Sequence, residues 1–557
     1  MPRLLPVALL APAVALLLWL SLGRVEPRAD FVVATDQVRT IDPQRASFAD
    51  ELAVAAALFE GLTRLNERTF LPEPGAAERW EISADGRRYV FHLRPGARWS
   101  NGEPLLAGHF VRAWEYVLDP ACETQYAPAL FVIEGAEAYY RAAGGVERLP
   151  AETLGIRAID DRTLELRLVA PCPYLLEILS FPIFAPIYPP LLERFVYRDG
   201  RVLRGTRHLW LRPEHIVSNG AFRLVAWGFK ERFLLTRNEH YWDRDVCDVE
   251  TIEFYLAPSG HAAQIAYETG RVDMLRGLDV EVALELRRQQ EAGRRRDFRL
   301  GDRFATFFLR VNCRRPPLDD PELRKALALA IDKDELCRHV MGLGEQPADH
   351  YVPWHLLPGD VAAEAHGLAA DQTREERLAE ARRLFSRSRA GRAGGGGRPL
   401  ELAYAPEPAA FRRVCEAVAE MWRRDLGLRV ELRALEPRVL SERIRRLDYD
   451  VVRSNWFGDY SDAMTFLDMF TSRSAQNRTG WADAGYDARI AAAAREPVAA
   501  RRIELLQAAE RRLCLEELPI IPLFFMRGNA LLDPRFELAD SLRGVPQFHR
   551  VRRAATR

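Results

Sequence analysis

The segment from Phe59 to Phe110 constrains the fold of this chain more than any other stretch. It opens with the helix end F-E-G-L, passes through a proline-bracketed crossing, and then alternates on both sides of the turn Asp85-Gly86. A D-G pair between alternating apolar residues predicts a tight β-hairpin. The strand V-F-H-L-R and the turn W-S-N-G-E-P follow, and they lead into a helix expected at about 107–118.

Length and composition limit the class of protein. A chain of 557 residues exceeds what one hydrophobic core usually supports, so two or three lobes are expected. Strand and helix signals alternate without one period, which favours α/β lobes over a pure sandwich or bundle. The 79 basic and 79 acidic residues balance, so the charge gives no case for nucleic-acid binding. The seven cysteines include no C-x-x-C pair, and most are expected to be buried free thiols.

The N-terminus predicts export. Arg3 precedes an uncharged run from Leu4 to Leu22 that is about long enough to span a bilayer. Small residues at Ser21 to Gly23 suit a signal peptidase, so the run is either removed as a signal peptide or kept as a membrane anchor. No cysteine follows closely, which excludes lipid attachment there. Both alternatives place the bulk of the chain outside the cytoplasm.

Four further stretches extend the pattern of the first segment: 217–242, with a predicted turn at Asn219-Gly220, 270–273, 307–333 and 448–471. Together they resemble the extracytoplasmic solute-binding proteins of the peptide and nickel family, family 5, and most closely its oligopeptide-binding branch. The resemblance runs from about Phe31 to about Phe548.

This resemblance implies the fold. It implies an α/β periplasmic-binding-protein fold (type II, cluster C) with two lobes, a hinge between them, and an extra domain on the first lobe. Ligand would be buried between lobes that close around it. The expected division is a signal peptide or anchor at 1–30, lobe I at 31–59, 184–304 and 526–557, extra domain II at 60–183, and lobe III at 305–525.

Asp459, in the stretch W-F-G-D-Y, is the main candidate for ligand chemistry. A carboxylate among aromatic residues in a closed cleft would accept a ligand ammonium group in a low dielectric. The resemblance implies the same role, because an aspartate of a W-x-x-D-Y pattern pairs with the peptide α-amino group in that branch. The alternative is that Asp459 caps a turn.

The resemblance also implies a backbone grip, in which the peptide is added as a strand between two protein segments. Tyr126 corresponds to an aromatic residue that contacts peptide, and Arg453 to an arginine that holds a peptide C-terminus. A packing tyrosine and a salt bridge in the cleft wall are the respective alternatives. The two gripping segments are Asn455, Trp456 and Phe457, and Ser47, Phe48 and Ala49.

The expected function is therefore to bind oligopeptides outside the cytoplasm and deliver them, as a monomer without cofactor or metal, to the permease subunits of an ABC importer. A receptor for another solute (nickel chelate, haem or oligosaccharide) and a membrane-tethered peptide sensor are the alternatives within binding. An enzyme is a third class. The carboxylate pairs 459/462 and 319/320 could suggest acid–base hydrolysis. Such pairs are frequent at turns and caps, however, and neither G-x-S-x-G nor H-E-x-x-H occurs.

Overall fold

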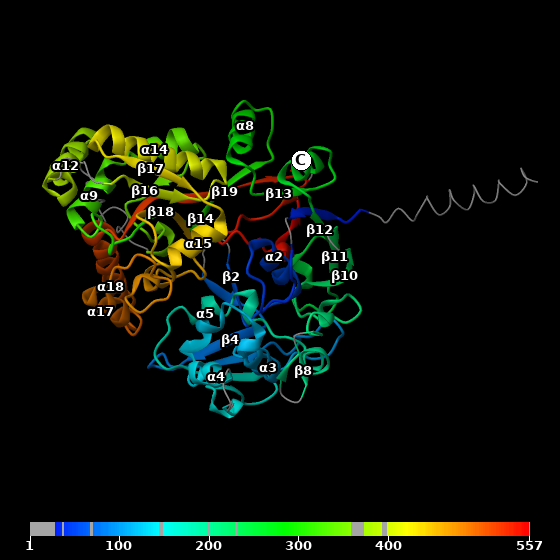
Figure 1. The fold of residues 1–557 in the computed structure, drawn as a ribbon. Coiled ribbons are helices and arrows are strands. Elements are labelled where there is room, and N and C mark those ends of the chain that lie inside the picture. Colours follow the sequence, from blue (N-terminus) through cyan, green and yellow to red (C-terminus); the bar gives the residue numbers. More distant parts are fainter. Residues whose placement is uncertain are drawn as a thin grey trace, which may run out of the picture.

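The computed structural model describes residues 28–35, 38–66, 71–143, 149–198, 201–203, 205–228, 231–357, 372–392 and 398–555. These residues form two α/β lobes and a smaller domain beneath them (Figure 1). The expected signal peptide or anchor at 4–22 lies outside them. Within the described ranges, no helix is both long enough and apolar enough to cross a membrane.

Among the described residues, one mixed sheet of 11 strands runs through both lobes in the order β10-β11-β12-β1-β13-β19-β14-β18-β16-β17, with β15 beside β19. Lobe I is built on β10 to β13 and β1, and lobe III on β18, β16 and β17 (Figure 1). The strands are β1 (Phe31–Thr35), β10 (Phe222–Gly228), β11 (Arg232–Arg237), β12 (Thr251–Leu256), β13 (Met274–Arg276), β14 (Phe298–Val311), β15 (Gln346–Pro347), β16 (Leu400–Tyr404), β17 (Val430–Ala434), β18 (Val451–Phe457) and β19 (Ile520–Leu532).

Lobe I is organised around β1, the strand that begins at Phe31. All of its residues are buried and it pairs in parallel with β12 and β13, as a continuous apolar run predicts. Phe31 and Leu58, the last residue of the first helix, belong to the same hydrophobic core. The helices of this part of the chain are α2 (Ala49–Leu58), α6 (Pro189–Leu191), α7 (Gly260–Glu268) and α8 (Val280–Glu291).

Strands β14 and β19 cross between the lobes. Residues 298–302 of β14 pair with 527–531 of β19 near β13, whereas 306–310 pair with 520–525 beside β18. The register shifts between these two runs. We call the three residues at the shift, Arg303 to Ala305, the hinge segment, because the ladder passes from one lobe to the other there.

The smaller domain contains a four-stranded antiparallel sheet in the order β4-β5-β7-β6. Strands β4 and β5 pair around Asp85-Gly86, where Gly86 has a φ of 66°, so the predicted hairpin is confirmed. The fully buried Trp99 and Trp114 lie in the core of this domain. Its elements are β4 (Ala77–Ile82), β5 (Arg88–Leu93), β6 (Ile156–Ala158), β7 (Thr163–Arg167), α3 (Ala107–Val117), α4 (Ala136–Ala143) and α5 (Leu175–Ile178).

Helices cover the sheet of lobe III. Asp320 caps the first of them, because its carboxylate accepts the amide of Glu322 at 3.1 Å, as the D-P pair predicts. Trp422 is fully buried and donates from Nε1 to the Leu327 carbonyl at 2.9 Å. The helices are α9 (Pro321–Ala330), α10 (Lys333–Glu335), α12 (Arg374–Arg387), α13 (Arg389–Arg392), α14 (Ala409–Leu426), α15 (Pro437–Arg445), α16 (Met464–Leu467), α17 (Ala484–Ala493) and α18 (Ala499–Arg511).

The prediction of a hairpin turn at Asn219-Gly220 is wrong. The β10–β11 hairpin begins only at Phe222 and closes beyond Gly228. Asn219 is buried instead, and its amide donates to the Glu60 carbonyl at 2.8 Å while its Oδ1 accepts the Glu60 amide at 3.2 Å. A Cβ on Gly220 would lie 2.6 Å from the Leu58 carbonyl carbon, so this position requires glycine. The N-G pair therefore fixes the end of α2.

All seven cysteines are free thiols, and six of them are buried, as the composition suggested. Ala305 and Phe457 are direct register partners across β14 and β18. Neither carries a thiol, so no disulfide joins these strands at that point.

Candidate functional site

The last five residues of β18, 453–457, form an open strand edge. Strand β18 pairs with β14 along its whole length. On the other side, β16 pairs only with Val451 and Val452, and no further described strand continues the pairing. Backbone amides and carbonyls on that side are therefore available to an added strand.

Gly458 and Asp459 form a tight turn directly after this edge. The Gly458 amide donates to the carbonyl oxygen of Phe304 in the hinge segment at 2.7 Å. The Asp459 amide donates to Thr465 Oγ1 at 3.0 Å. A Cβ on Gly458 would lie 2.8 Å from Phe466 Cε2, so a larger residue would displace the turn. The turn holds Asp459 between the hinge segment and α16.

The Asp459 carboxylate has no ion-pair partner and makes no capping hydrogen bond within the described part of the chain. Burial raises the pKa of Asp459 to about 6, and the positive charge of Arg543 opposes this rise. A carboxylate removed from water without a contacting counter-ion is a strong acceptor for a cation. Asp459 is thus equipped to bind an ammonium group at the end of the open edge.

Two aromatic residues of the W-F-G-D-Y stretch, Trp456 and Tyr460, contact different partners. Trp456 donates from Nε1 to the Thr465 carbonyl at 2.9 Å, which holds its ring against α16. The Tyr460 ring stacks on Tyr174 of the smaller domain, with centroids 4.7 Å apart and planes at 9°. The stack of Tyr460 on Tyr174 joins lobe III to the smaller domain beside Asp459.

Tyr126 and Phe457 complete the aromatic surroundings. The Tyr126 ring meets Phe181 edge-on with centroids 5.5 Å apart. Burial and the charge of Asp459 raise the pKa of Tyr126 to about 12, which places its hydroxyl in the electrostatic field of that carboxylate. Phe457 is 46% exposed at the end of the strand. Tyr126 and Asp459, predicted from distant stretches, are thus brought near each other.

Arg453 and Asn455 lie side by side on one face of β18. Arg453 donates from Nη1 to Asn455 Oδ1 at 2.8 Å, and its guanidinium lies 4.9 Å from the centroid of the Phe411 ring. Burial lowers the pKa of Arg453. No acidic side chain of the described ranges forms an ion pair with it, so the alternative of a salt bridge in the cleft wall is not realised there. The guanidinium remains a candidate for a ligand carboxylate.

The second expected gripping segment, Ser47 to Ala49, leads into α2, with Phe48 at the N-cap and Ala49 as the first helical residue. The amides of Ser47 and Phe48 donate to the Glu51 carboxylate at 3.0 and 3.3 Å, and the Phe48 carbonyl accepts the Leu52 amide. Phe48 is 52% exposed, and Arg39 lies over its ring. Helix capping thus occupies two of the amides that a ladder with a peptide would use. This segment offers fewer free backbone groups than β18.

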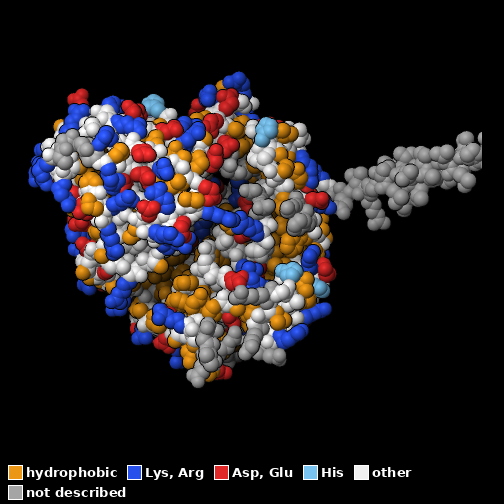
Figure 2. All heavy atoms as spheres, viewed as in Figure 1, with side chains coloured by type: hydrophobic (Ala, Val, Ile, Leu, Met, Phe, Trp, Pro, Cys, Tyr) orange, Lys and Arg blue, Asp and Glu red, His pale blue; other side chains and the backbone are white. Residues whose placement is uncertain are grey.

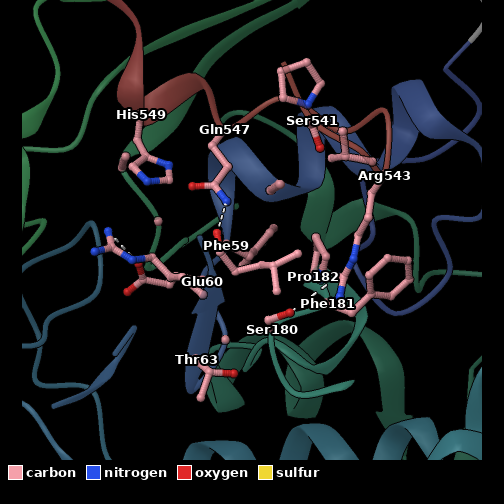
Figure 3. Close-up of a pocket in the computed structure, with 18 of the residues that line it drawn as sticks. Phe59, Glu60, Thr63, Ser180, Phe181, Pro182, Ser541, Arg543, Gln547 and His549 are labelled. Carbon is pink, nitrogen blue, oxygen red and sulfur yellow. Dashed lines mark hydrogen bonds and ion pairs between the residues drawn. The ribbon is translucent and has the colours of Figure 1, made fainter. Parts of the chain in front are cut away.

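Two charged residues that the motifs did not mark lie beside the site. Arg543 belongs to the C-terminal segment and points toward Ser180 at the edge of a cavity of about 90 Å³ (Figure 3). Glu177 belongs to α5, and burial raises its pKa to about 7. Glu177 is the one charged residue in the apolar run 171–190, and this contrast in the sequence could have marked it as a candidate site residue. Arg543 stands in no motif, so only the fold reveals it.

The carboxylate pairs considered for hydrolysis have other partners. Asp462 binds Arg502 with both oxygens, at 2.7 and 2.8 Å, and also accepts the Met464 amide. Asp319 pairs with Arg389 at 2.6 Å, and its neighbour caps α9. Among the described residues, no cluster of three or more histidine, cysteine, aspartate or glutamate side chains could hold a metal ion.

The surface is hollowed near the centre of the view in Figure 2, between lobe III and the remainder of the molecule.

The chain matches the family of bacterial extracellular solute-binding proteins, family 5 Middle, over residues 72–478. It is 28% identical to the oligopeptide-binding protein OppA of Bacillus subtilis, over 91% of this chain and 88% of that one. It is 29% identical to the probable deoxycholate-binding periplasmic protein YgiS of Escherichia coli, over 89% and 87%. The open, unliganded structure of the periplasmic murein tripeptide-binding protein MppA superposes with a TM-score of 0.77 at 26% identity, covering 95% of this chain and 98% of that one.

This chain therefore belongs to solute-binding protein family 5 and has its two-lobed α/β fold.

Proposed function

We propose that this protein is the extracytoplasmic receptor of an ABC importer, which binds oligopeptides in a closing cleft and passes them to membrane permease subunits. The observation that carries the proposal is the open edge of β18 ending directly at Asp459. A peptide has the matching order of groups, with a positively charged amino end followed by an extended backbone. The names of the relatives, which include an oligopeptide-binding protein, agree with this ligand class.

Backbone pairing supplies affinity without selecting sequence. Residues 453–457 would bond the peptide as an added strand, and Asp459 would fix its amino end. Asn455, Trp456 and Phe457 provide the backbone, whereas the side chain of Tyr126 would flank the first ligand residue. Ligand side chains would enter hydrated pockets, where water adapts to different shapes.

Closure would bury the ligand. We place lobe I at 31–59, 184–304 and 526–557, domain II at 60–183, and lobe III at 305–525, with rotation about the hinge segment. The protein acts as a monomeric, non-enzymatic binder in this proposal. It reaches its compartment through residues 4–22, either as a cleaved signal or as a tether.

The decisive test compares Ala-Ala-Ala with N-acetyl-Ala-Ala-Ala by calorimetry on the mature protein. Acetylation removes the positive charge, so affinity should fall by about tenfold or more, as expected when a buried carboxylate loses its partner. Equal affinity for the two peptides rejects recognition of the amine. Mass spectrometry of ligand released from natively purified protein should show short peptides.

A second candidate is a receptor for another solute on the same fold, and the 29% identity to a probable deoxycholate-binding protein favours it. Receptors for nickel chelate, haem or oligosaccharide are further forms of this second candidate. A single non-peptide mass among the released ligands, with no binding of either tripeptide, selects this candidate.

A further inference from the structure

A second charged group, Arg543, is held at the hinge next to Asp459. Phe304 of the hinge segment donates its amide to the Leu542 carbonyl at 3.0 Å and accepts the Gly458 amide at 2.7 Å. Asp459 and Arg543 each follow directly after one of these bonds. The two residues come from different lobes, Asp459 from lobe III and Arg543 from the C-terminal segment of lobe I, yet the backbone of Phe304 is bonded next to both. Their separation therefore depends little on how far the lobes close.

The Arg543 guanidinium has donors with no acceptor. Its Nη1 lies 3.4 Å from Ser180 Oγ, and its Cζ lies 5.7 Å from the centroid of the Phe181 ring. Nε and Nη2 are buried and have no hydrogen-bond partner among the described residues. Buried guanidinium groups are normally hydrogen-bonded, because an unmet charged donor is costly. The geometry leaves two donors for an acceptor that enters from outside the chain.

The carboxylates around Arg543 do not fill this role. Glu177 and Asp459 both attract Arg543 electrostatically, but neither forms an ion pair with it within 4.0 Å. Glu177 Oε2 is itself buried without a partner. Asp462, the other nearby acid, is occupied by Arg502. Arg543 and Ser180 both line the cavity of about 90 Å³, which exceeds the space of one water molecule.

Resting on the proposed function, we propose that Arg543 is a specificity-determining residue that binds a carboxylate of the ligand close to its amino end, while Asp459 binds the ammonium group. A planar guanidinium with two free donors matches a carboxylate in a bidentate manner. An extended peptide rises by about 3.4 Å per residue, so only acids near the amino end are in reach. Two sources qualify: the side chain of an acidic first residue, and the C-terminus of a dipeptide.

Matched pairs of ligands distinguish the two sources of the carboxylate. They also distinguish both from the alternative that Arg543 is only a counter-ion for the acids of the protein. Calorimetry compares Glu-Ala-Ala with the isosteric Gln-Ala-Ala, and Ala-Ala with Ala-Ala-amide. Parent protein should prefer the acidic member of at least one pair by about tenfold, the expected value of a charge-assisted bidentate pair. The pair that shows the preference identifies the source of the carboxylate.

Three variants test the residue. Arg543→Gln should bring the affinity ratio of the responding pair to about one, and Arg543→Lys should leave an intermediate ratio, because lysine keeps the charge without the fork. Glu177→Gln should increase the ratio, since it removes the acid that competes for Arg543. Arg552→Gln alters an exposed surface ion pair and should leave the ratio at the parent value.

A ratio of one for both ligand pairs in the parent, or a preference that survives in Arg543→Gln, overturns the inference while peptide binding itself stands. Failure of all four peptides to bind overturns the proposed function together with it. Because the ratio is measured within each variant, a general loss of affinity or stability does not imitate the expected result.

Discussion

Tyr174 and Tyr460 stack face to face, with ring centroids 4.7 Å apart and planes at 9°, and so join the smaller domain to lobe III. The Cζ atom of Arg502 lies 5.8 Å from the centroid of the Tyr174 ring, and Arg502 pairs with Asp462, two residues after Tyr460. The contact lies directly beyond Asp459 in the sequence and therefore bounds the end of the cleft at which an ammonium group is expected.

Replacing Tyr174 by alanine should weaken ligand binding by about three- to tenfold, since an aromatic pair contributes about 0.5–1.5 kcal/mol. The physical reason is that the stack joins the smaller domain to lobe III beside Asp459, so its loss loosens the end of the cleft at which the ligand is expected. Calorimetry with a tripeptide measures the effect. Tyr174→Phe keeps the ring and should bind like the parent. A loss of the same size in both variants would assign the effect to the hydroxyl rather than to the stack.

Asp459→Asn should lower tripeptide affinity by about tenfold or more, because a buried charge loses its partner at a cost of about 2–5 kcal/mol. The substitution keeps the size of the side chain and removes only the charge. Asp245→Asn is a suitable control, since its side chain is 95% exposed and it belongs to the segment between β11 and β12. Unchanged binding by Asp459→Asn would remove this residue from the site.

Ligand affinity should depend on pH through Asp459, whose pKa burial raises from 3.8 to about 6. The ammonium group binds the ionised form, so the Kd should be flat above pH 7 and rise by up to about tenfold per unit below pH 6. Arg543, Tyr126 and Asp468 also face this carboxylate electrostatically. Subtracting the profile of Asp459→Asn removes their contributions.

The stability of the ligand-free protein should depend on pH in the opposite direction to its affinity for ligand. The folded, ligand-free protein binds the Asp459 proton more tightly than the unfolded chain, so this group adds stability as the pH falls from about 6 to about 4. Asp459→Asn should accordingly have a higher Tm than the parent at pH 7 and a similar one at pH 4. Thermal melts without ligand measure the difference. A lower Tm for the variant at pH 7 would contradict a raised pKa.

Gly458→Ala should lower both affinity and stability, because the added Cβ would lie 2.8 Å from Phe466 Cε2 and 3.1 Å from Thr465 Cγ2. Phe466 is fully buried and cannot move aside, so overpacking should cost about 1–3 kcal/mol. Gly108→Ala in α3 provides the contrast, since nothing lies within 4 Å of its added Cβ. That variant should gain up to about 1 kcal/mol from helix propensity. Chemical denaturation and calorimetry check both.

Much of the fold was predictable because its signals are local. The D-G hairpin, the D-P helix start at Asp320 and the buried strand at Phe31 each depend on a few neighbouring residues. The turn expected at Asn219-Gly220 failed because a long-range partner, Glu60, uses the same residues. Local propensity could not reveal that competition.

The residues of the candidate site likewise include some that local sequence could predict and some that only long-range contacts reveal. Asp459 and the strand before it lie in one stretch, so the W-F-G-D-Y pattern was enough to predict them. Arg543 lies 84 positions later in a segment without a motif, and only the bonds through Phe304 bring it to the site. The engagement of Ser47 and Phe48 by Glu51 was equally hidden, because side-chain capping competes with pairing only once the helix exists.

The long strands β14 and β19 have a consequence for how the molecule comes apart. Each strand contributes residues to the ladders of both lobes, so neither lobe can melt without stripping the neighbouring strand from the other. The pair of lobes should consequently unfold in a single cooperative transition, in contrast to the stepwise loss that is common in proteins of this size.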